Sequence, residues 1–351
     1  LSRRISAVWT ERLGSHAEGL RQRLPHLLRH LAALVLLAIV LAAPIAYDML
    51  RLIWWALLGV LLIGFAIMGG MDLGIGALLP FVARTDEERR VLLNLSGPTW
   101  EGNQVWLVLG GGAILAAWPA IYAASFSGFY IAMIAILLAL ILRPVGFKFR
   151  GKVADPRWRT VWDWALFVGG FVPSLVFGVA VGNLFLGVPF RLDDALRPAY
   201  EGNFFLLLTP FALLTGLVSL SMLLTQGATV IAARTDGPLA ARARRYGQWT
   251  AAATMVLFIV GGLVTLFLLS GFKVTSVQDI FGPSNPLLKT VVIAPGAWAV
   301  NYVAMPWMIA APCLAVIGSV IAYLALGLKA KGLGIFGSSL AIFGIIATAG
   351  L

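Results

Sequence analysis

The sequence predicts an all-α fold, a polytopic transmembrane bundle of eight core helices with room for an extra N-terminal helix. Of 351 residues, 60% are hydrophobic and only 12% are charged, and the mean hydropathy is +0.93. A typical soluble domain has about twice this charged fraction. The composition therefore excludes a soluble globular enzyme and a disordered chain. The single cysteine, Cys313, excludes a disulfide scaffold.

Eight apolar runs are long enough to span a membrane. A hydrocarbon core about 30 Å thick requires roughly 20 residues of apolar helix. The runs are 50–71, 104–123, 127–143, 161–186, 204–232, 248–271, 305–327 and 332–351. They show no period-2 alternation, and backbone groups in lipid must be satisfied within the segment, so we expect helices rather than an outer-membrane barrel.

The charges between these runs predict the orientation of the chain. Loops rich in Lys and Arg are expected on the cytoplasmic side, and they are 143–159, 234–247 and the turn that contains Lys329 and Lys331. Loops without this excess, 187–203 and 272–304, are expected outside. The alternation also assigns 84–100 to the cytoplasm. It accounts for the formal net charge of +11 without nucleic-acid binding.

Residues 1–47 form a separate segment ahead of a membrane domain at 48–351. Six arginines precede an apolar run from Leu31 to Tyr47 that only Pro44 interrupts. This pattern is typical of a signal peptide with a long first part and equally of an additional helix that begins inside. A mis-set start of translation is a third interpretation.

Histidine is absent from residue 48 onward. All three histidines, His16, His26 and His30, lie in the N-terminal segment. Haem, zinc and copper are held mostly by His or Cys, and a Met in an apolar helix usually serves packing. The sequence therefore predicts no metal site and no catalytic residue in this chain. In a redox complex, a partner subunit would supply the metals.

Acids within or beside the runs are the main functional candidates, because an ionisable group in a bilayer is costly. Asp72 lies near the inner end of the first run, and Glu101 opens the second run from the same side. Two such acids would form the mouth of a cytoplasmic proton path. An interfacial or helix-capping role is the alternative for both. For Asp163, at the start of the fourth run, that structural role is favoured.

Four further residues are supporting candidates. Trp100, Asn103 and Gln104 flank Glu101 in a Trp-Glu-Gly-Asn-Gln string at a membrane boundary. Arg143 ends the third run, where its side chain is expected to extend towards the cytoplasmic headgroups. An anionic partner for Arg143, such as a lipid phosphate or a haem propionate of another subunit, is the less favoured interpretation.

A series of motifs, in order from about residue 48 to 351, resembles subunit II of the cytochrome bd quinol oxidases. The motifs are Arg51-Leu52-Ile53-Trp54-Trp55, Met71-Asp72-Leu73-Gly74, the string from Gly97 to Trp106, Ala116-Ala117-Trp118-Pro119, Phe126-Ser127-Gly128-Phe129-Tyr130, Arg143-Pro144-Val145-Gly146-Phe147, Trp162-Asp163-Trp164, Gly202-Asn203-Phe204-Phe205, Thr225-Gln226-Gly227-Ala228 and Ser284-Asn285-Pro286-Leu287.

The resemblance implies an eight-helix, haem-free subunit that pairs with a subunit I carrying haem b and haem d. Such a complex oxidises quinol, reduces oxygen to water and builds a proton gradient without pumping. It also implies a prokaryotic cytoplasmic (inner) membrane, a small accessory membrane subunit and, in some members, a structural quinone. The acids that match Asp72 and Glu101 are associated with proton uptake from the cytoplasm. Which quinone is used stays open.

This sequence departs from the family pattern at several places. Glu101 stands where many relatives have Asp, and Gly69 stands where some carry another acid, so a proton path here has fewer carriers. Residues 1–47 have no counterpart in the family pattern. The chain ends inside or just after the eighth run, which predicts a truncated C-terminus.

Two other functions remain to be weighed. A stand-alone secondary transporter would show internal repeats with broken helices near the midplane, but no motif recurs at a fixed offset and the polar groups cluster at one interface. Nothing in the sequence excludes a purely scaffolding subunit, whose acids serve structure alone.

Overall fold

The computed structural model describes residues 47–193, 197–277 and 288–350. Two of the expectations above, the extension before residue 47 and the motif at 284–287, lie outside these ranges. The chain divides into two units, residues 1–54 and 55–351. Of the first unit, only the beginning of one helix is described. The second unit contains every other element discussed below.

The first apolar run forms one long helical stretch. It consists of helix α2 (Tyr47–Gly64), a π-helical segment η1 (Phe65–Gly69) and helix α3 (Gly70–Val82). The predicted end at residue 71 is therefore wrong by about three turns. Asp72 is not at the end of its helix but ten residues before it, about 15 Å along the axis. The helix tolerates Asp72 in its buried part because Ser96 and Asn103 hydrogen-bond the two carboxyl oxygens.

Helix α4 (Asp86–Ser96) replaces part of the predicted cytoplasmic loop at 84–100. Thr85 and Glu88 form a capping box at its start, in which each side chain accepts from the other's backbone N–H. Three acids in the first turn, including Asp86, are favoured there by the helix dipole.

The second apolar run is split into two helices. Helix α5 (Trp100–Ala117) ends at Trp118, and helix α6 (Pro119–Gly128) starts with a proline. A residue before proline is disfavoured in the α conformation, and Trp118 adopts φ −138° and ψ 66°. Among the described residues, seven helical stretches are long and apolar enough to cross a membrane, and the predicted span at 104–123 is not one of them.

The other predicted runs form helices close to their expected positions. They are α7 (Tyr130–Phe149), α8 (Pro156–Leu186), α9 (Pro210–Arg234), α10 (Gly237–Phe267), α12 (Ala310–Gly327) and α13 (Lys331–Gly350), with the short helices η2 (Phe204–Leu207), α11 (Ala297–Ala304) and η4 (Pro306–Ile309) beside them. Most begin earlier or end later than the apolar run does, because helices continue past the hydrocarbon into the interface.

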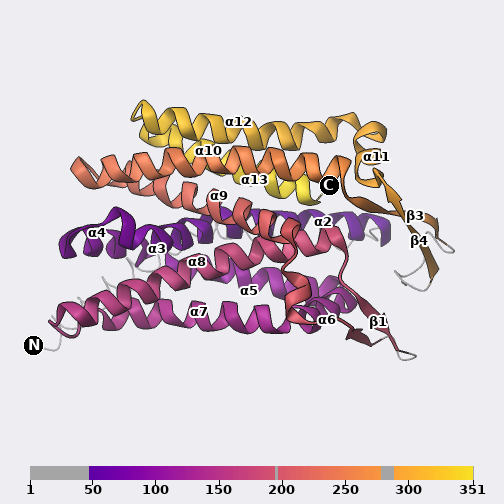
Figure 1. Cartoon of the computed structure of the whole chain (residues 1–351), viewed down its shortest axis with the longest axis horizontal. Coiled ribbons are helices and arrows are strands. Elements are labelled where there is room, and N and C mark those ends of the chain that lie inside the picture. Colours follow the sequence, from indigo (N-terminus) through magenta and orange to yellow (C-terminus); the bar gives the residue numbers. More distant parts are fainter. Residues whose placement is uncertain (1–46, 194–196, 278–287, 351) are drawn as a thin grey trace, which may run out of the picture. The chain divides into compact units, whose positions relative to one another are not determined.

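Two antiparallel hairpins occupy the loops that the sequence assigns to the outside. Strand β1 (Phe190–Leu192) pairs with β2 (Pro198–Tyr200), and β3 (Ser270–Val277) pairs with β4 (Lys289–Pro295). Within the second unit, both hairpins lie at one end of the long helices, next to α6 and α11. Helix α4 lies at the opposite end (Figure 1). This arrangement agrees with the alternation of loops predicted from charge.

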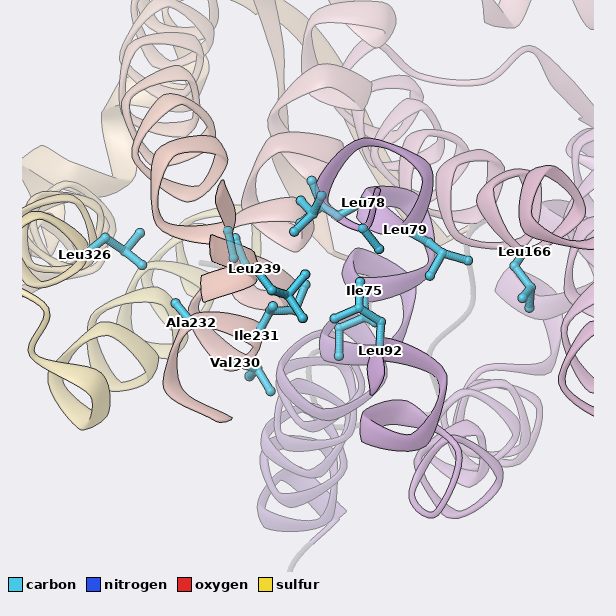
Figure 2. Close-up of a cluster of buried hydrophobic side chains, with 14 residues drawn as sticks. Ile75, Leu78, Leu79, Leu92, Leu166, Val230, Ile231, Ala232, Leu239 and Leu326 are labelled. Atoms are coloured by element: carbon cyan, nitrogen blue, oxygen red, sulfur yellow. The ribbon is translucent and has the colours of Figure 1, made fainter. Parts of the chain in front are cut away.

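The core joins α3 and α9 to the helices around them. Ile75 and Leu78 of α3 lie on the side of Ile231 of α9, whereas Leu79 points towards Leu166 of α8, and Leu92 brings α4 into the same cluster (Figure 2). Helices α3 and α9 approach closely because glycines face each other. A Cβ added at Gly227 would lie 2.5 Å from the carbonyl carbon of Gly74, so a small residue is needed there.

Candidate functional site

Asp72, in the first turn of α3, is the centre of a buried polar site. Only 2% of the residue is exposed. Its Oδ1 accepts a hydrogen bond of 2.7 Å from Ser96 Oγ, and its Oδ2 accepts one of 2.7 Å from Asn103 Nδ2. A buried carboxyl is tolerated only when its oxygens are hydrogen-bonded. Both donors are uncharged, which distinguishes this acid from a salt-bridged structural one.

The π-helical segment immediately before α3 is held by α9. Gln226 Nε2 donates to Ile67 O at 3.3 Å, and Gln226 Oε1 accepts from Ser338 Oγ at 2.6 Å. A π-helical turn shifts the register of every residue that follows. The segment therefore decides which way Asp72 points. No local sequence signal indicates it.

Helix α5 brings Asn103, but not Glu101, to Asp72. Residues two apart on an α-helix point about 200° away from each other, so the two side chains lie on different faces. Asn103 is buried against Asp72, whereas Glu101 is exposed and Gln104 is half-buried. Helix α5 thus places the supporting residue Asn103 beside Asp72 and leaves Glu101 on another of its faces.

Arg143 of α7 lies in the interior, so the expected extension towards the headgroups is wrong. Only 5% of it is exposed. Its Cζ lies 5.8 Å from the centre of the Trp100 ring, which itself stacks on Phe147 at 5.5 Å. This arrangement is a cation–π contact. Among the described residues, no hydrogen-bond partner is found for Arg143 Nη2.

Asp72 and Arg143 line the same small cavity. Its volume is about 10 Å³, about enough for the centre of one water molecule. Ser96 also lines it, together with apolar side chains that include Phe147 and Leu166. The cavity fits a water molecule between charged and hydroxyl groups. It does not fit a quinone ring.

Asp163 is neither interfacial nor a helix cap. It is 1% exposed, and Arg150 and Arg89 bind its two oxygens. The cap of α8 is Asp155, which accepts from the backbone N–H of Arg157. The expected interfacial or capping position of Asp163 is therefore wrong, because the two arginines that bind it come from α4 and from the end of α7 and are not visible in the local sequence.

The acids of α4 are held by arginines as well. Burial alone would raise the pKa of the Asp86 carboxyl, but the hydrogen bond from Arg150 and the charges of Arg150 and Arg159 outweigh it and lower that pKa. The pKa of Glu88 is also lowered, because bonds from the Arg84 N–H and from Arg242 outweigh burial. Both acids therefore stay ionised at neutral pH.

The donors for a metal or haem iron are sparse. Within the ranges described, no group of three or more His, Cys, Asp or Glu side chains is positioned to hold a metal ion. Cys313 is exposed, and the sequence has no histidine after His30. This donor set does not fit an axial haem ligand, which is usually His.

Comparison with known proteins gives concordant matches. Residues 50–351 match the family described as cytochrome bd terminal oxidase subunit II. The chain is 49% identical over 307 residues to the cytochrome bd-I ubiquinol oxidase subunit 2 of Escherichia coli (strain K12), which covers 88% of this chain and 81% of that protein. It is 48% identical over 305 residues to the probable cytochrome oxidase subunit 2 of Haemophilus influenzae, with coverages of 87% and 80%.

The fold is also similar to that of a solved oxidase. The structure of bd oxidase from Geobacillus thermodenitrificans matches with a TM-score of 0.62 at 16% identity, over 85% of this chain and 83% of that one. The resemblance seen in the motifs is confirmed by these matches. This multi-pass membrane chain belongs to the cytochrome bd terminal oxidase subunit II family and is a subunit of an oxygen-reducing oxidoreductase complex.

Proposed function

We propose that this chain is the haem-free subunit of a cytochrome bd-type quinol oxidase in a prokaryotic cytoplasmic membrane. In this role it stabilises the haem-bearing subunit I and conducts protons inward from the cytoplasmic side through Asp72. Haems b and d, which the family implies for subunit I, supply the electron transfer and the reduction of oxygen. A small accessory membrane subunit completes the complex.

The observation that carries the proton route is the environment of Asp72. A carboxyl inside a membrane span is expensive and is a functional hypothesis by default. Ser96 Oγ and Asn103 Nδ2 bind its oxygens without neutralising it. Among the described residues no arginine or lysine forms an ion pair with Asp72, whereas an acid paired with arginine is held in its charged form.

The two donors have different chemistry. A serine hydroxyl both donates and accepts, so Ser96 is able to receive a proton from a water in the cavity and pass its own to Asp72 Oδ1. The amide nitrogen of Asn103 only donates. Its role is to fix the orientation of Oδ2. Arg143, in the same cavity, offsets the charge of the ionised carboxyl.

Glu101 is the second acid of the proposed route. It is exposed at the start of α5, one turn or less from Asn103. An exposed carboxyl at that position collects protons from water and raises their local concentration near the entrance. Its contribution is smaller than that of Asp72, because water replaces an exposed carrier more easily than a buried one.

Replacement of Asp72 in the assembled complex tests this function. We expect Asp72→Asn to lower quinol-dependent oxygen consumption by about tenfold or more, because a positioned proton carrier typically contributes 10²–10⁴-fold. Proton uptake from the cytoplasmic side of proteoliposomes should fall in parallel, and the haem absorption bands should keep their full intensity.

Asp155→Asn is the matched control, because Asp155 is an exposed cap on the same side. It should leave turnover unchanged. Full turnover in a haem-loaded Asp72→Asn complex would contradict the proton route and leave the chain a scaffold. Expression without subunit I should yield a pigment-free chain.

A further inference from the structure

A buried ion-pair cluster lies at the cytoplasmic end of the helices, apart from the Asp72 site. Arg150, at the end of α7, donates from Nε to Asp163 Oδ1 at 2.5 Å and from Nη2 to Asp163 Oδ2 at 3.2 Å. Both side chains are almost fully buried, with exposures of 3% and 1%. An isolated buried charge is very costly, so each charge here depends on its partner.

The cluster continues onto the first turn of α4. Arg89 Nη1 binds Asp163 Oδ2 at 2.7 Å, and Arg150 Nη2 binds Asp86 Oδ1 at 2.9 Å. Arg159 of α8 reaches the other oxygen of Asp86 at 3.0 Å. Two charged residues of α4, one acidic and one basic, are thus bound by groups from α7 and α8.

The opposite side of the same turn is bound to α10. Arg242 forms an ion pair with Glu88 and donates from Nε to Val82 O at 2.7 Å. Helix α4 begins with five charged residues in a row. Only Leu92 of this helix enters the apolar cluster as a fully buried side chain (Figure 2). Ion pairs therefore hold the start of α4 on both sides.

The other end of α4 carries the donor to Asp72. Ser96 is the last residue of the helix, and Asn103 lies on the helix that follows. An α-helix is stiff, and ten residues of it span about 15 Å. Any movement of the first turn is therefore transmitted to Ser96.

We propose that Asp163 and Arg150 are positioning residues for the Asp72 carboxyl, which they act on through α4. Their ion pairs with Arg89 and Asp86 fix the first turn of α4, and the helix fixes Ser96 Oγ against Asp72 Oδ1. The proposal deepens the proton route above and rests on it for its effect on turnover. Its structural part is independent of that route.

Loss of the Asp163 charge has a definite consequence. Arg150 keeps Asp86, but Arg89 loses its only ion pair among the described residues. Arg89 is already 24% exposed, so it can turn outward to water. The first turn of α4 is then held by Asp86 and Glu88 alone, and we expect it to shift and the hydrogen bond from Ser96 to Asp72 to lengthen.

The infrared band of the Asp72 carboxyl tests this directly. The band is identified as the one that is missing in Asp72→Asn, and it is recorded in the assembled, haem-loaded complex. Ser96→Ala should move the band of the protonated carboxyl to higher frequency, because the group loses one of its two hydrogen bonds. We expect Asp163→Asn to move it in the same direction. The double variant should move it no further than Ser96→Ala alone.

Asp236→Asn is the matched control. Asp236 pairs with Lys331 on the same side of the membrane, and within the described ranges no hydrogen bond or ion pair joins its side chain to α4, so its loss should leave the band in place. If Asp163→Asn does not assemble, Arg89→Gln removes only the α4 side of the pair and should cause a smaller shift of the same sign.

An unshifted Asp72 band in an assembled Asp163→Asn or Arg89→Gln complex would overturn the proposal, because a cluster that serves stability alone lowers assembly without changing this band. The proton route fails separately. If turnover is normal in Asp72→Asn, the route is wrong, while the infrared shift still decides whether the cluster positions Ser96.

Discussion

At the residue scale, the contrast between Ser96 and Asn103 gives the site its chemistry. Both bind Asp72 at 2.7 Å, but only the serine hydroxyl is able to accept a proton and to donate one. The proposed relay therefore depends on the Ser96 oxygen, and Asn103 contributes orientation.

Ser96→Ala should slow quinol-dependent oxygen consumption severalfold, because it removes the relay group and leaves a methyl group beside Asp72. Ser96→Thr, which keeps the hydroxyl, should retain most of the turnover. Ser174→Ala is the control, since Ser174 is a buried serine of α8 whose hydroxyl, within the described part of the chain, donates to Gly170 O at 2.6 Å and to no other group. Equal rates in Ser96→Ala and Ser174→Ala would exclude the relay.

Glu101→Gln should lower turnover less than Asp72→Asn does. The reason is the exposure of Glu101, which allows water and buffer to deliver protons in its place. The reduction should therefore shrink as the buffer concentration rises, and Glu101→Asp should behave like the unmodified chain. A loss as large as that of Asp72→Asn, unchanged by buffer, would show that Glu101 is an obligatory carrier.

At the element scale, the close approach of α3 and α9 holds the site in register. Gly74 and Gly227 meet backbone to backbone, and Gln226 of α9 binds Ile67 in the π-helical segment. Association of helices in lipid depends on such packing, since the hydrophobic effect does not drive it. The position of Asp72 is thus fixed by a neighbouring helix.

Gly227→Ala should lower the stability of the purified complex by about 1–3 kcal/mol, the usual cost of an added methyl group in a packed core. Thermal unfolding of the complex in detergent measures the change. Gly262→Ala is the matched control and should leave the unfolding midpoint unchanged. Gly262 also lies in a long helix, but an added Cβ there would have nothing within 4 Å. An unchanged midpoint in Gly227→Ala would mean that the two helices separate easily.

At the scale of the whole molecule, charge gathers at the end that carries α4, which we expect to be cytoplasmic, and many large apolar side chains are exposed on the helices. Loops rich in arginine predict this orientation, and some of their arginines also bind the acids of α4. Asp86 is one of these acids, and its lowered pKa makes stability depend on pH.

The expected dependence follows from linkage. A carboxyl whose pKa is lower in the folded protein stabilises the fold above its unfolded value, here 3.8, and this contribution is lost as the pH falls through the folded value. The unfolding temperature should therefore decrease between about pH 5 and about pH 3. Asp86→Asn should weaken this decrease, whereas Glu87→Gln, an exposed neighbour, should not. Identical pH profiles of the unfolding temperature for Asp86→Asn and Glu87→Gln would contradict this role of the Asp86 carboxyl.

The sequence by itself determined the class of the molecule. Hydropathy, loop charge and the missing histidines depend on residue type and on short stretches of chain, so they predicted a helical membrane bundle and its orientation. The motifs predicted the family. The prediction of one span at 104–123 is wrong because hydropathy does not register the break that Pro119 imposes, and hydropathy does not predict α4 because that helix begins with charged residues.

Only the tertiary structure decided which side chains meet. Ser96 and Asn103 reach Asp72 across 24 and 31 residues of chain, and Arg89 reaches Asp163 across 74. Such pairings depend on the rotation and depth of whole helices, and a single π-helical segment or a pair of facing glycines alters both. Local periodicity contains no information about these contacts, so the partners of Asp72, Arg143 and Asp163 became visible only once the helices were packed.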